Sequence, residues 1–336
     1  MTAVHGFGLG IATHNSAGDT LEVYYPQPLS NIQGELADVL NPVSGTLDAA
    51  QLNELEAALL KGGAADQAAL ANQLKECSGS VVATVLKDNV APTTVEDAYL
   101  KLHLLSHRLV RPHDTDLDGL FGLLPTIAWT DRGAVCLSDL HQRQLDARLR
   151  GSVLEVASVD KFPKMTNYVV PSGVRIAHTA RVRLGAYLGE GTTVMHEGFI
   201  NFNAGTEGPG MIEGRISAGV WIGGGSDLGG GCSTMGTLSG GGNIVISVGR
   251  ECLIGANAGL GIPLGDRCTI EAGLFITAGT KVTVLDGARK PVDTVSARDL
   301  ANKSDLLFRR NSTTGTVECL TNRSAIELNE SLHANN

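Results

Sequence analysis

The sequence lacks the features that mark membrane, secreted or nucleic-acid-binding proteins. No apolar stretch approaches the roughly 18 residues that a membrane span requires. The N-terminus does not show the charged-then-apolar pattern of a signal peptide. The formal net charge is -9 and no basic run occurs, which argues against nucleic-acid binding. We therefore predict a cytoplasmic protein with no membrane partner and no nucleic-acid partner.

Cysteines with metal-binding or redox spacing are also missing. Six cysteines are scattered along the chain without a CxxC motif, namely Cys77, Cys136, Cys232, Cys252, Cys268 and Cys319. This distribution favours reduced thiols over a disulfide framework or a zinc site. His103 and His107 lie four residues apart in a predicted helix, which is the spacing of a metal-binding pair. With no third ligand in the sequence around them, we interpret both as packing or surface histidines.

Glycine is abundant, with 42 residues, and apolar residues recur at every sixth position. A first series contains Val170, Ile176, Val182, Leu188, Val194 and Ile200. A second contains Ile216, Ile222 and Leu228, and continues through Ile246, Cys252, Ala258, Leu264, Ile270, Ile276 and Val282. A period of six fits neither a helix nor an isolated strand, but it is typical of hexapeptide repeats, in which three short strands close one triangular coil. We predict a mainly β protein with a parallel β-helix over residues 169–285.

The repeat is interrupted twice. Ile200 and Ile216 are 16 residues apart, which is not a multiple of six, so we predict that residues 201–211 leave the coil as an excursion. Residues 235–245 form a second break. Excursions from a rigid repeat tend to carry function.

Two residues at these breaks have chemistry of interest. Glu213, two residues before Arg215, could act as a general base or as a nucleophile that forms an acyl anhydride. On spacing alone, an ordinary surface ion pair is the simpler interpretation. Gly236, in the second break, could direct its backbone N–H at an oxyanion.

The residues on either side of the repeat predict further parts. Residues 1–150 mix strand and helix patterns and are predicted to form an α/β domain, followed by a lead-in segment over residues 151–168. Its predicted elements are a strand at 20–25, helices at 47–61, 64–76 and 98–109, a strand at 81–86, a capping box at 93–96 and a helix capped by Ser138. Residues 286–336 are predicted to form a C-terminal hairpin and tail, with strands at 306–312 and 316–320 and a last helical segment at 326–333.

Six segments resemble the tetrahydrodipicolinate N-succinyltransferases, in the longer bacterial form with an extended N-terminal domain. They are residues 158–165, 194–206, 211–217, 235–242, 253–257 and 307–312. The resemblance implies a left-handed β-helix, a homotrimer, and transfer of a succinyl group from succinyl-CoA to the amine of tetrahydrodipicolinate. The products would be N-succinyl-2-amino-6-oxopimelate and CoA, in the diaminopimelate and lysine pathway. Succinyl-CoA would be a cosubstrate, and no permanently bound cofactor is expected.

The resemblance also assigns residues. Glu213 takes the position of the family's acyl-anhydride carboxylate, and Gly236 takes that of the oxyanion donor. Contacts to succinyl-CoA fall on Arg215, Gly230, Ser233, Ala256, Glu271, Ala272, Gly279, Arg309, Arg310, Asn311 and Ser312. Some relatives hold magnesium on the three-fold axis through an Asp and a Glu. The Glu position is Glu197, but the Asp position is Ala180, so the implied magnesium site is incomplete in this chain.

Several alternatives stay open. The substrate amine could attack the thioester directly while Glu213 takes its proton, or Glu213 could first accept the succinyl group. An acetyl-CoA-dependent N-acetyltransferase and a non-catalytic trimeric scaffold are the rival functions. A γ-type carbonic anhydrase would need three zinc histidines, and the repeat offers only His178 and His196. Arg181, Arg183 and Arg215 are the arginines nearest the first break, and are candidates for holding substrate carboxylates.

Overall fold

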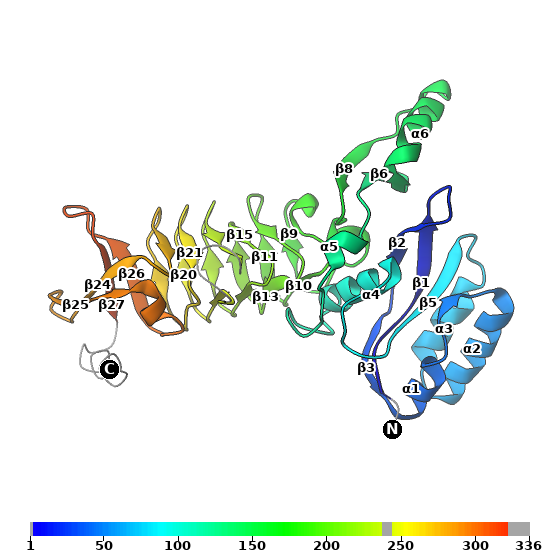
Figure 1. The fold of residues 1–336 in the computed structure, drawn as a ribbon, viewed down its shortest axis with the longest axis horizontal. Coiled ribbons are helices and arrows are strands. Elements are labelled where there is room, and N and C mark those ends of the chain that lie inside the picture. The colour runs from blue at the N-terminus through cyan, green and yellow to red at the C-terminus, as the bar shows by residue number, and fades with distance from the viewer. Residues whose placement is uncertain (1–2, 237–243, 322–336) are drawn as a thin grey trace. The chain divides into compact units, whose positions relative to one another are not determined.

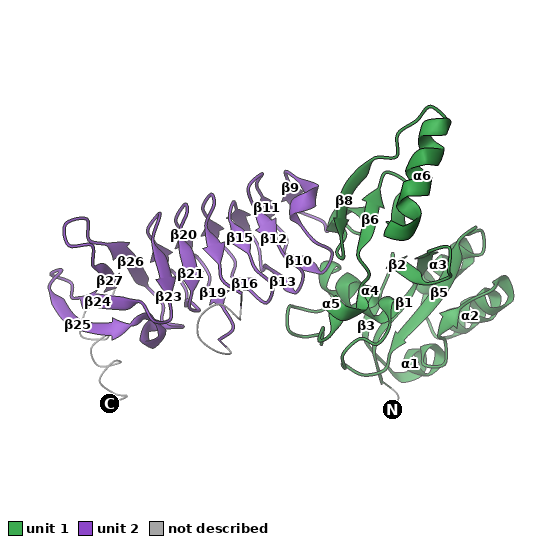
Figure 2. Cartoon of the chain, turned by 45° about the horizontal axis from the view of Figure 1, so that its top comes forward, with its two compact units in different colours: residues 1–169 green, residues 170–336 purple. Residues whose placement is uncertain are grey.

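The computed structural model describes residues 3–236 and 244–321, which divide into two compact units, residues 1–169 and residues 170–336 (Figure 2). No helix within these described ranges is long and apolar enough to cross a membrane. The boundary predicted at residue 150 is wrong. Strand β8 (Val156–Asp160), in the predicted lead-in, pairs with β6 (Ile127–Thr130), so the lead-in belongs to the first unit.

The first unit contains an antiparallel sheet in the order β2-β1-β5-β4, with β3 also paired to β1 (Figure 1). Its strands are β1 (Ala3–His14), β2 (Thr20–Tyr24), β3 (Leu29–Gln33), β4 (Gly45–Thr46) and β5 (Ser80–Leu86). Its helices are α1 (Gly34–Leu40), α2 (Ala49–Lys61), α3 (Ala65–Leu74) and α4 (Val95–Ser106). A second, small sheet joins β6, β7 (Gly133–Cys136) and β8; α6 (Leu137–Leu149) contacts β6 and β7, and α5 (Leu120–Leu123) contacts α4.

Alternation along β1 explains how the sheet is covered on both faces. Phe7 and Leu9 are fully buried in the cluster formed with α1, α2 and α3. Gly8 lies between them and faces the other way, where a Cβ would lie 2.5 Å from the Tyr25 ring and 2.8 Å from Leu100 of α4. Glycine on this face therefore lets α4 approach the backbone of the sheet.

The elements predicted for this unit are mostly confirmed, with two corrections at helix starts. The capping box joins Thr94 and Asp97, one residue later than predicted, because the Asp97 side chain reaches back to the Thr94 N–H. Helix α6 begins at Leu137 with Cys136 as its N-cap residue, and Ser138 lies inside the first turn.

His103 is a packing residue, as predicted. Its ring is fully buried, Nδ1 lies 2.7 Å from the Tyr99 carbonyl, and Nε2 accepts the Tyr25 N–H at 3.2 Å. Burial lowers the pKa of His103 to about 3. His107 stacks on it, with ring centroids 6.0 Å apart. Both ring nitrogens of His103 are thus engaged within the protein, and the ring is held neutral.

The second unit is a parallel β-helix whose strands fall into three sheets along its length (Figures 1 and 2). The sheet that carries the site, called here the β12 sheet, has the order β12-β15-β18-β21-β23. Its strands are β12 (Phe199–Ile200), β15 (Arg215–Ile216), β18 (Ser233–Thr234), β21 (Gly259–Gly261) and β23 (Phe275–Thr277). A four-stranded sheet contains β10 (Ala186–Leu188), β13 (Ala204–Thr206), β16 (Trp221–Ile222) and β19 (Ser247–Val248).

The third sheet is the longest and includes the C-terminal hairpin. The strands that it takes from the β-helix coils are β9 (Arg175–Ile176), β11 (Thr192–Val194), β14 (Gly210–Ile212), β17 (Asp227–Leu228), β20 (Leu253–Ile254) and β22 (Thr269–Ile270). After these come β24 (Lys281–Leu285), β25 (Pro291–Ser296), β26 (Leu306–Arg310) and β27 (Val317–Thr321). The hairpin predicted near the C-terminus is confirmed as the antiparallel pair β26–β27. The helical segment predicted at 326–333 lies outside the described residues.

The predicted excursion over residues 201–211 is wrong, because this stretch forms a regular part of the coil. Strand β13 pairs in parallel with β10 and β16, and β14 pairs with β11 and β17. Two features concealed this from the six-residue pattern. The corner between Ile212 and Ile216 is two residues short, and the rung between Ile200 and Ile212 is Thr206, not an apolar residue.

Threonines serve as interior rungs because their hydroxyls are satisfied inside the prism. Thr206 Oγ1 lies 2.7 Å from Thr192 Oγ1, and Thr192 Oγ1 donates to the Gly189 carbonyl at 2.6 Å. Thr234 is fully buried and donates to the Arg215 carbonyl. A buried hydroxyl with a partner carries little of the cost of a buried polar group without one.

The second predicted break is confirmed by the pairing register. Val194 pairs with Ile212 and Ile212 with Leu228, intervals of 18 and 16 residues, whereas Trp221 pairs with Ser247, an interval of 26. The longer interval shows an insertion between β18 and β19. Part of it, residues 237–243, lies outside the described residues.

Candidate active site

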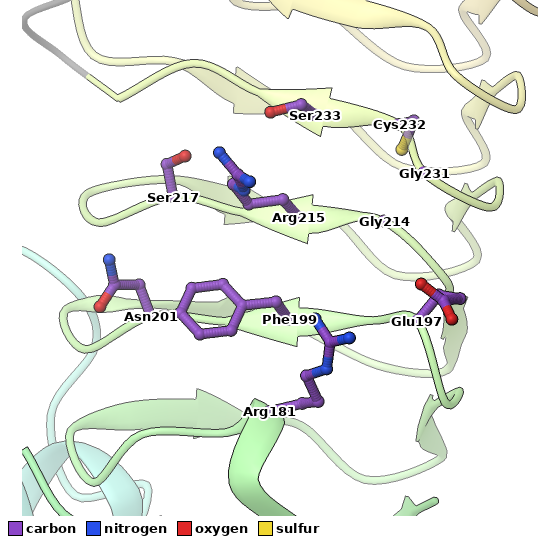
Figure 3. Close-up of a pocket in the computed structure, with 10 residues that line it drawn as sticks. All are labelled: Arg181, Glu197, Phe199, Asn201, Gly214, Arg215, Ser217, Gly231, Cys232 and Ser233. Carbon is purple, nitrogen blue, oxygen red and sulfur yellow. The ribbon is translucent and has the colours of Figure 1, made fainter. Parts of the chain in front are cut away.

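A cavity of about 580 Å³ lies on the outer face of the β12 sheet (Figure 3). Its lining residues come from consecutive coils of the β-helix: Arg181, Glu197, Phe199, Asn201, Gly214, Arg215, Ser217, Gly231, Cys232 and Ser233. Phe199, Arg215 and Ser233 are register partners on β12, β15 and β18, so their side chains stack outward in one row. Arg181 precedes them by one coil, because Val182 bridges to Ile200.

The arginines near the cavity differ in what holds them. Arg183 donates to the Asn201 carboxamide at 3.1 Å and lies over the Phe199 ring at 5.9 Å. It supports two lining residues and does not line the cavity itself. Arg181 and Arg215 do line it, and neither guanidinium group forms a hydrogen bond or an ion pair with the described part of the chain. Two guanidinium groups are therefore available to anions in one cavity.

Many of the predicted succinyl-CoA contacts stack along one corner of the β-helix. The ladder Leu228–Ile254–Ile270–Phe308 places Gly230, Ala256, Ala272 and Arg310 at equivalent positions, two residues after each rung. The Asn257 N–H donates to the Gly230 carbonyl at 2.9 Å, which ties adjacent levels together. We call the set formed by Gly230, Ala256, Ala272 and Arg310, together with Glu213 from the coil before Gly230, the corner column.

Glu213 stands at this corner, half-buried, between β14 and β15. Its backbone N–H donates to the Leu228 carbonyl at 2.8 Å. A Cβ on Gly230 would lie 3.4 Å from Glu213 Oε2, so the carboxylate lies against a residue predicted to contact the coenzyme. A Cβ at residue 230 would be in van der Waals contact with that carboxylate.

Gly236 lies beyond the C-terminal ends of the strands of the β12 sheet, on the opposite side of the sheet's outer face from Glu213. Glu213 precedes β15, whereas Gly236 follows β18, and a Cβ on Gly236 would lie 3.7 Å from Ser217 Cβ. The cavity spans the distance between them, since its lining includes Gly214 beside Glu213 and Ser217 beside Gly236. The structure thus brings both predicted catalytic residues to the borders of one cavity, not into contact. Gly279 follows β23 at the same end as Gly236.

The hairpin residues predicted to contact the coenzyme form a network of their own. Arg309 Nε and Nη2 donate to Glu318 Oε2 at 3.0 and 2.9 Å, and Asn311 Nδ2 donates to Glu318 Oε1 at 2.8 Å. The Arg310 N–H donates to the Glu271 carboxylate at 2.7 Å. Glu271 thus fixes the start of the turn that leads to Ser312. Glu318 thereby fixes the side chains of Arg309 and Asn311 relative to each other.

The pair of magnesium ligands implied by the family resemblance is incomplete in this chain. Glu197 is exposed at the cavity edge, and Ala180 has no ligand atom in its side chain. Within residues 3–236 and 244–321, no group of three or more His, Cys, Asp or Glu side chains could hold a metal. His178 and His196 pack edge to face with centroids 5.3 Å apart, but they have no third partner in the described chain.

Sequence reasoning missed Phe199, Asn201, Ser217 and Cys232 as lining residues. A usable signal was present, because Arg181, Phe199, Arg215 and Ser233 follow one another at intervals of 18, 16 and 18 residues, which are the lengths of the coils. Cys232 is nearly fully buried, and burial raises its pKa to about 12. It is therefore a structural thiol and not a nucleophile.

Comparison with known proteins agrees with this geometry. Residues 124–164 match the family model described as tetrahydrodipicolinate N-succinyltransferase middle, and residues 245–278 match the hexapeptide repeat of succinyl-transferase. The chain is 64% identical to a 2,3,4,5-tetrahydropyridine-2,6-dicarboxylate N-succinyltransferase of Pseudomonas putida, over 97% of each chain. It is 56% identical to that of Vibrio cholerae, over 99% of this chain and 100% of the relative.

A solved structure shares the fold. It comes from Campylobacter jejuni and is assigned to a 2,3,4,5-tetrahydropyridine-2-carboxylate N-succinyltransferase. Its TM-score is 0.87 at 30% identity, over 96% of this chain and 93% of that one.

Fold and cavity together define a hexapeptide-repeat acyltransferase with a left-handed β-helix. Within that class, the chain belongs to the tetrahydrodipicolinate N-succinyltransferase family.

Proposed function

We propose that the protein transfers the succinyl group of succinyl-CoA to tetrahydrodipicolinate, giving N-succinyl-2-amino-6-oxopimelate and CoA. Family membership supports the reaction. The observation that carries its placement is the cavity of the β12 sheet, which has Glu213 at one border, Gly236 at the other and two arginines inside. The reaction belongs to diaminopimelate and lysine biosynthesis. The cytoplasmic location stays a prediction.

Water adds to the cyclic imine and leaves a secondary amine in the ring, which attacks the thioester carbonyl of succinyl-CoA; the acylated ring then opens to the 6-oxo product. The new C–N bond forms, the C–S bond breaks, and CoA leaves as the thiol. Glu213 takes a proton from the attacking amine, and the Gly236 N–H donates to the oxygen that becomes negative in the transition state. Arg215 holds the carboxylate of the succinyl group, for which its planar fork is suited.

Coenzyme binding is proposed to follow the corner column. Gly230, Ala256 and Ala272 present small residues at equivalent levels, so a long, thin ligand can lie against the backbone there. Glu271, Ser233, Gly279 and the hairpin residues Arg309, Arg310, Asn311 and Ser312 extend this proposed contact surface. We propose a homotrimer as the active assembly, because flat β-helix faces bury their exposed side chains against neighbouring copies.

Substitution of Glu213 by Gln tests the role of the carboxylate. With both substrates saturating, release of the CoA thiol should fall by about 100-fold or more, the range expected on loss of a general base. Glu190→Gln, an exposed carboxylate of the same unit, is the matched control and should keep full activity. Near-normal activity of Glu213→Gln would exclude both versions of the mechanism.

Kinetics separate the two versions. An anhydride at Glu213 requires ping-pong behaviour and a succinyl adduct on the enzyme, whereas direct attack requires a ternary complex and no adduct. The acetyl-transferring alternative is tested by comparing succinyl-CoA with acetyl-CoA. An acetyl group has no carboxylate for Arg215, so a preference for acetyl-CoA would contradict the proposed role of that residue.

A further inference from the structure

We infer that Arg181 binds a carboxylate of the acceptor substrate, with the acceptor's ring lying over Phe199. The inference rests on the proposed function. It adds to it an assignment of which arginine holds which substrate.

The spacing of the two arginines indicates that each binds a different carboxylate. Arg181 and Arg215 flank Phe199 in the outward row, one coil before it and one coil after it (Figure 3). Neighbouring strands in a sheet are about 4.8 Å apart, so the backbones of the two arginines are roughly 10 Å apart. A phenyl ring thus separates two cationic groups in the same cavity.

This pattern matches the two substrates taken together. Tetrahydrodipicolinate is a six-membered ring with a carboxylate on either side of its nitrogen, and the succinyl group ends in one more carboxylate. If Arg215 holds the succinyl carboxylate, the free cation left in the cavity is Arg181. The ring of the acceptor then meets the aromatic face of Phe199, where apolar contact and ring stacking are favourable.

The surroundings preserve Arg181 for a ligand. Arg183, the nearest alternative, is held by Asn201 and lies over Phe199, so its guanidinium is already used to fix the ring. Glu197 is the single carboxylate among the lining residues, and in the described chain it forms no ion pair with either lining arginine. A cation in a cavity that has no ion-pair partner within the described chain is a binding group for an external anion.

The test uses the full-length protein and two readouts. The first is steady-state kinetics with each substrate varied in turn. Arg181→Gln should raise KM for tetrahydrodipicolinate by about 10- to 100-fold, the worth of a charge-assisted bidentate pair, and leave KM for succinyl-CoA within about twofold. Arg181→Lys keeps the charge without the fork, and should fall between Arg181→Gln and the unmodified protein. Arg132→Gln, an exposed arginine in the turn between β6 and β7, is the charge-matched control.

The second readout is direct binding of pyridine-2,6-dicarboxylate, an aromatic analogue that cannot accept a succinyl group. Titration calorimetry in the absence of succinyl-CoA should show that Arg181→Gln binds the analogue about 10- to 100-fold more weakly, because the same bidentate pair with a carboxylate is lost. Unchanged KM and unchanged affinity in both Arg181 variants would overturn the inference, as would an equal rise in KM for both substrates. If the unmodified protein binds the analogue through Arg181 but transfers no succinyl group, the inference stands and the proposed function fails.

Discussion

Replacing His103 by Gln should flatten the acid side of the stability profile of the first unit. The ring is fully buried, with Nδ1 against the Tyr99 carbonyl and Nε2 accepting the Tyr25 N–H. Protonation of Nε2 would break the second bond and place a charge among Tyr24, Tyr25 and Tyr168. The native state therefore excludes a proton that the unfolded chain accepts.

The sign and size follow from linkage. Burial lowers the pKa of His103 from its ordinary value of 6.5 to about 3. Between these values the unfolded chain binds one more proton, so stability falls as pH falls, by about 1.4 kcal/mol per pH unit. From neutral pH down to pH 5 the loss is about 2 kcal/mol. Burial also lowers the pKa of His107 and acts in the same direction, whereas it raises the pKa of Glu22, which opposes the loss at lower pH.

The assay is urea unfolding followed by the fluorescence of Trp129, which lies in the first unit, in a Trp221→Phe background that removes the signal of the second. His103→Gln should be less stable at pH 8, because its hydrogen bonds are altered, yet lose about 2 kcal/mol less than the parent between pH 7 and 5. His141→Gln, on the exposed face of α6, should keep the parental slope. Equal slopes in the parent and His103→Gln would refute the linkage argument.

Two further predictions concern the second unit. A Cβ added at Gly214 would lie 2.3 Å from Cys232 Sγ and 2.6 Å from the Cys232 carbonyl, so Gly214→Ala should destabilise this unit by about 2 kcal/mol or more and distort the cavity. Gly287→Ala, where a Cβ meets nothing within 4 Å, should leave the thermal midpoint unchanged, and equal midpoints for both variants would contradict the packing argument. Glu318→Ala frees Arg309 and Asn311 and should weaken CoA binding about tenfold in a titration. Tighter binding would mean that Glu318 competes with the coenzyme for Arg309 and does not position it.

The six-residue pattern predicted the β-helix because apolar rungs such as Ile222, Leu228, Ile270 and Ile276 fill the interior. It failed where the interior rung is Thr206, since a buried threonine paired with Thr192 has no hydrophobic signature. A short corner at Glu213 and Gly214 then looked like an excursion. Such corners depend on local backbone packing, which the order of apolar residues does not record.

The candidate site was also predicted only in part, because some of its features depend on contacts between coils. Resemblance to a family assigned Glu213, Arg215 and Gly236, but it could not tell Arg181 from Arg183, which are two residues apart. That distinction depends on Asn201 and Phe199, which come from the next coil and engage only one of the two arginines. Contacts between coils are invisible to spacing until the length of each coil is known.

The C-terminal hairpin has a consequence for solubility. A parallel β-helix that simply stopped at β22 and β23 would end in a row of unpaired N–H and carbonyl groups, which can template the addition of another chain. Here β26 pairs in parallel with β22, and β27 pairs in parallel with β24 and antiparallel with β26, so the exposed edge of β22 is covered. The hairpin thereby keeps the edge of β22 from pairing with a strand of a second molecule.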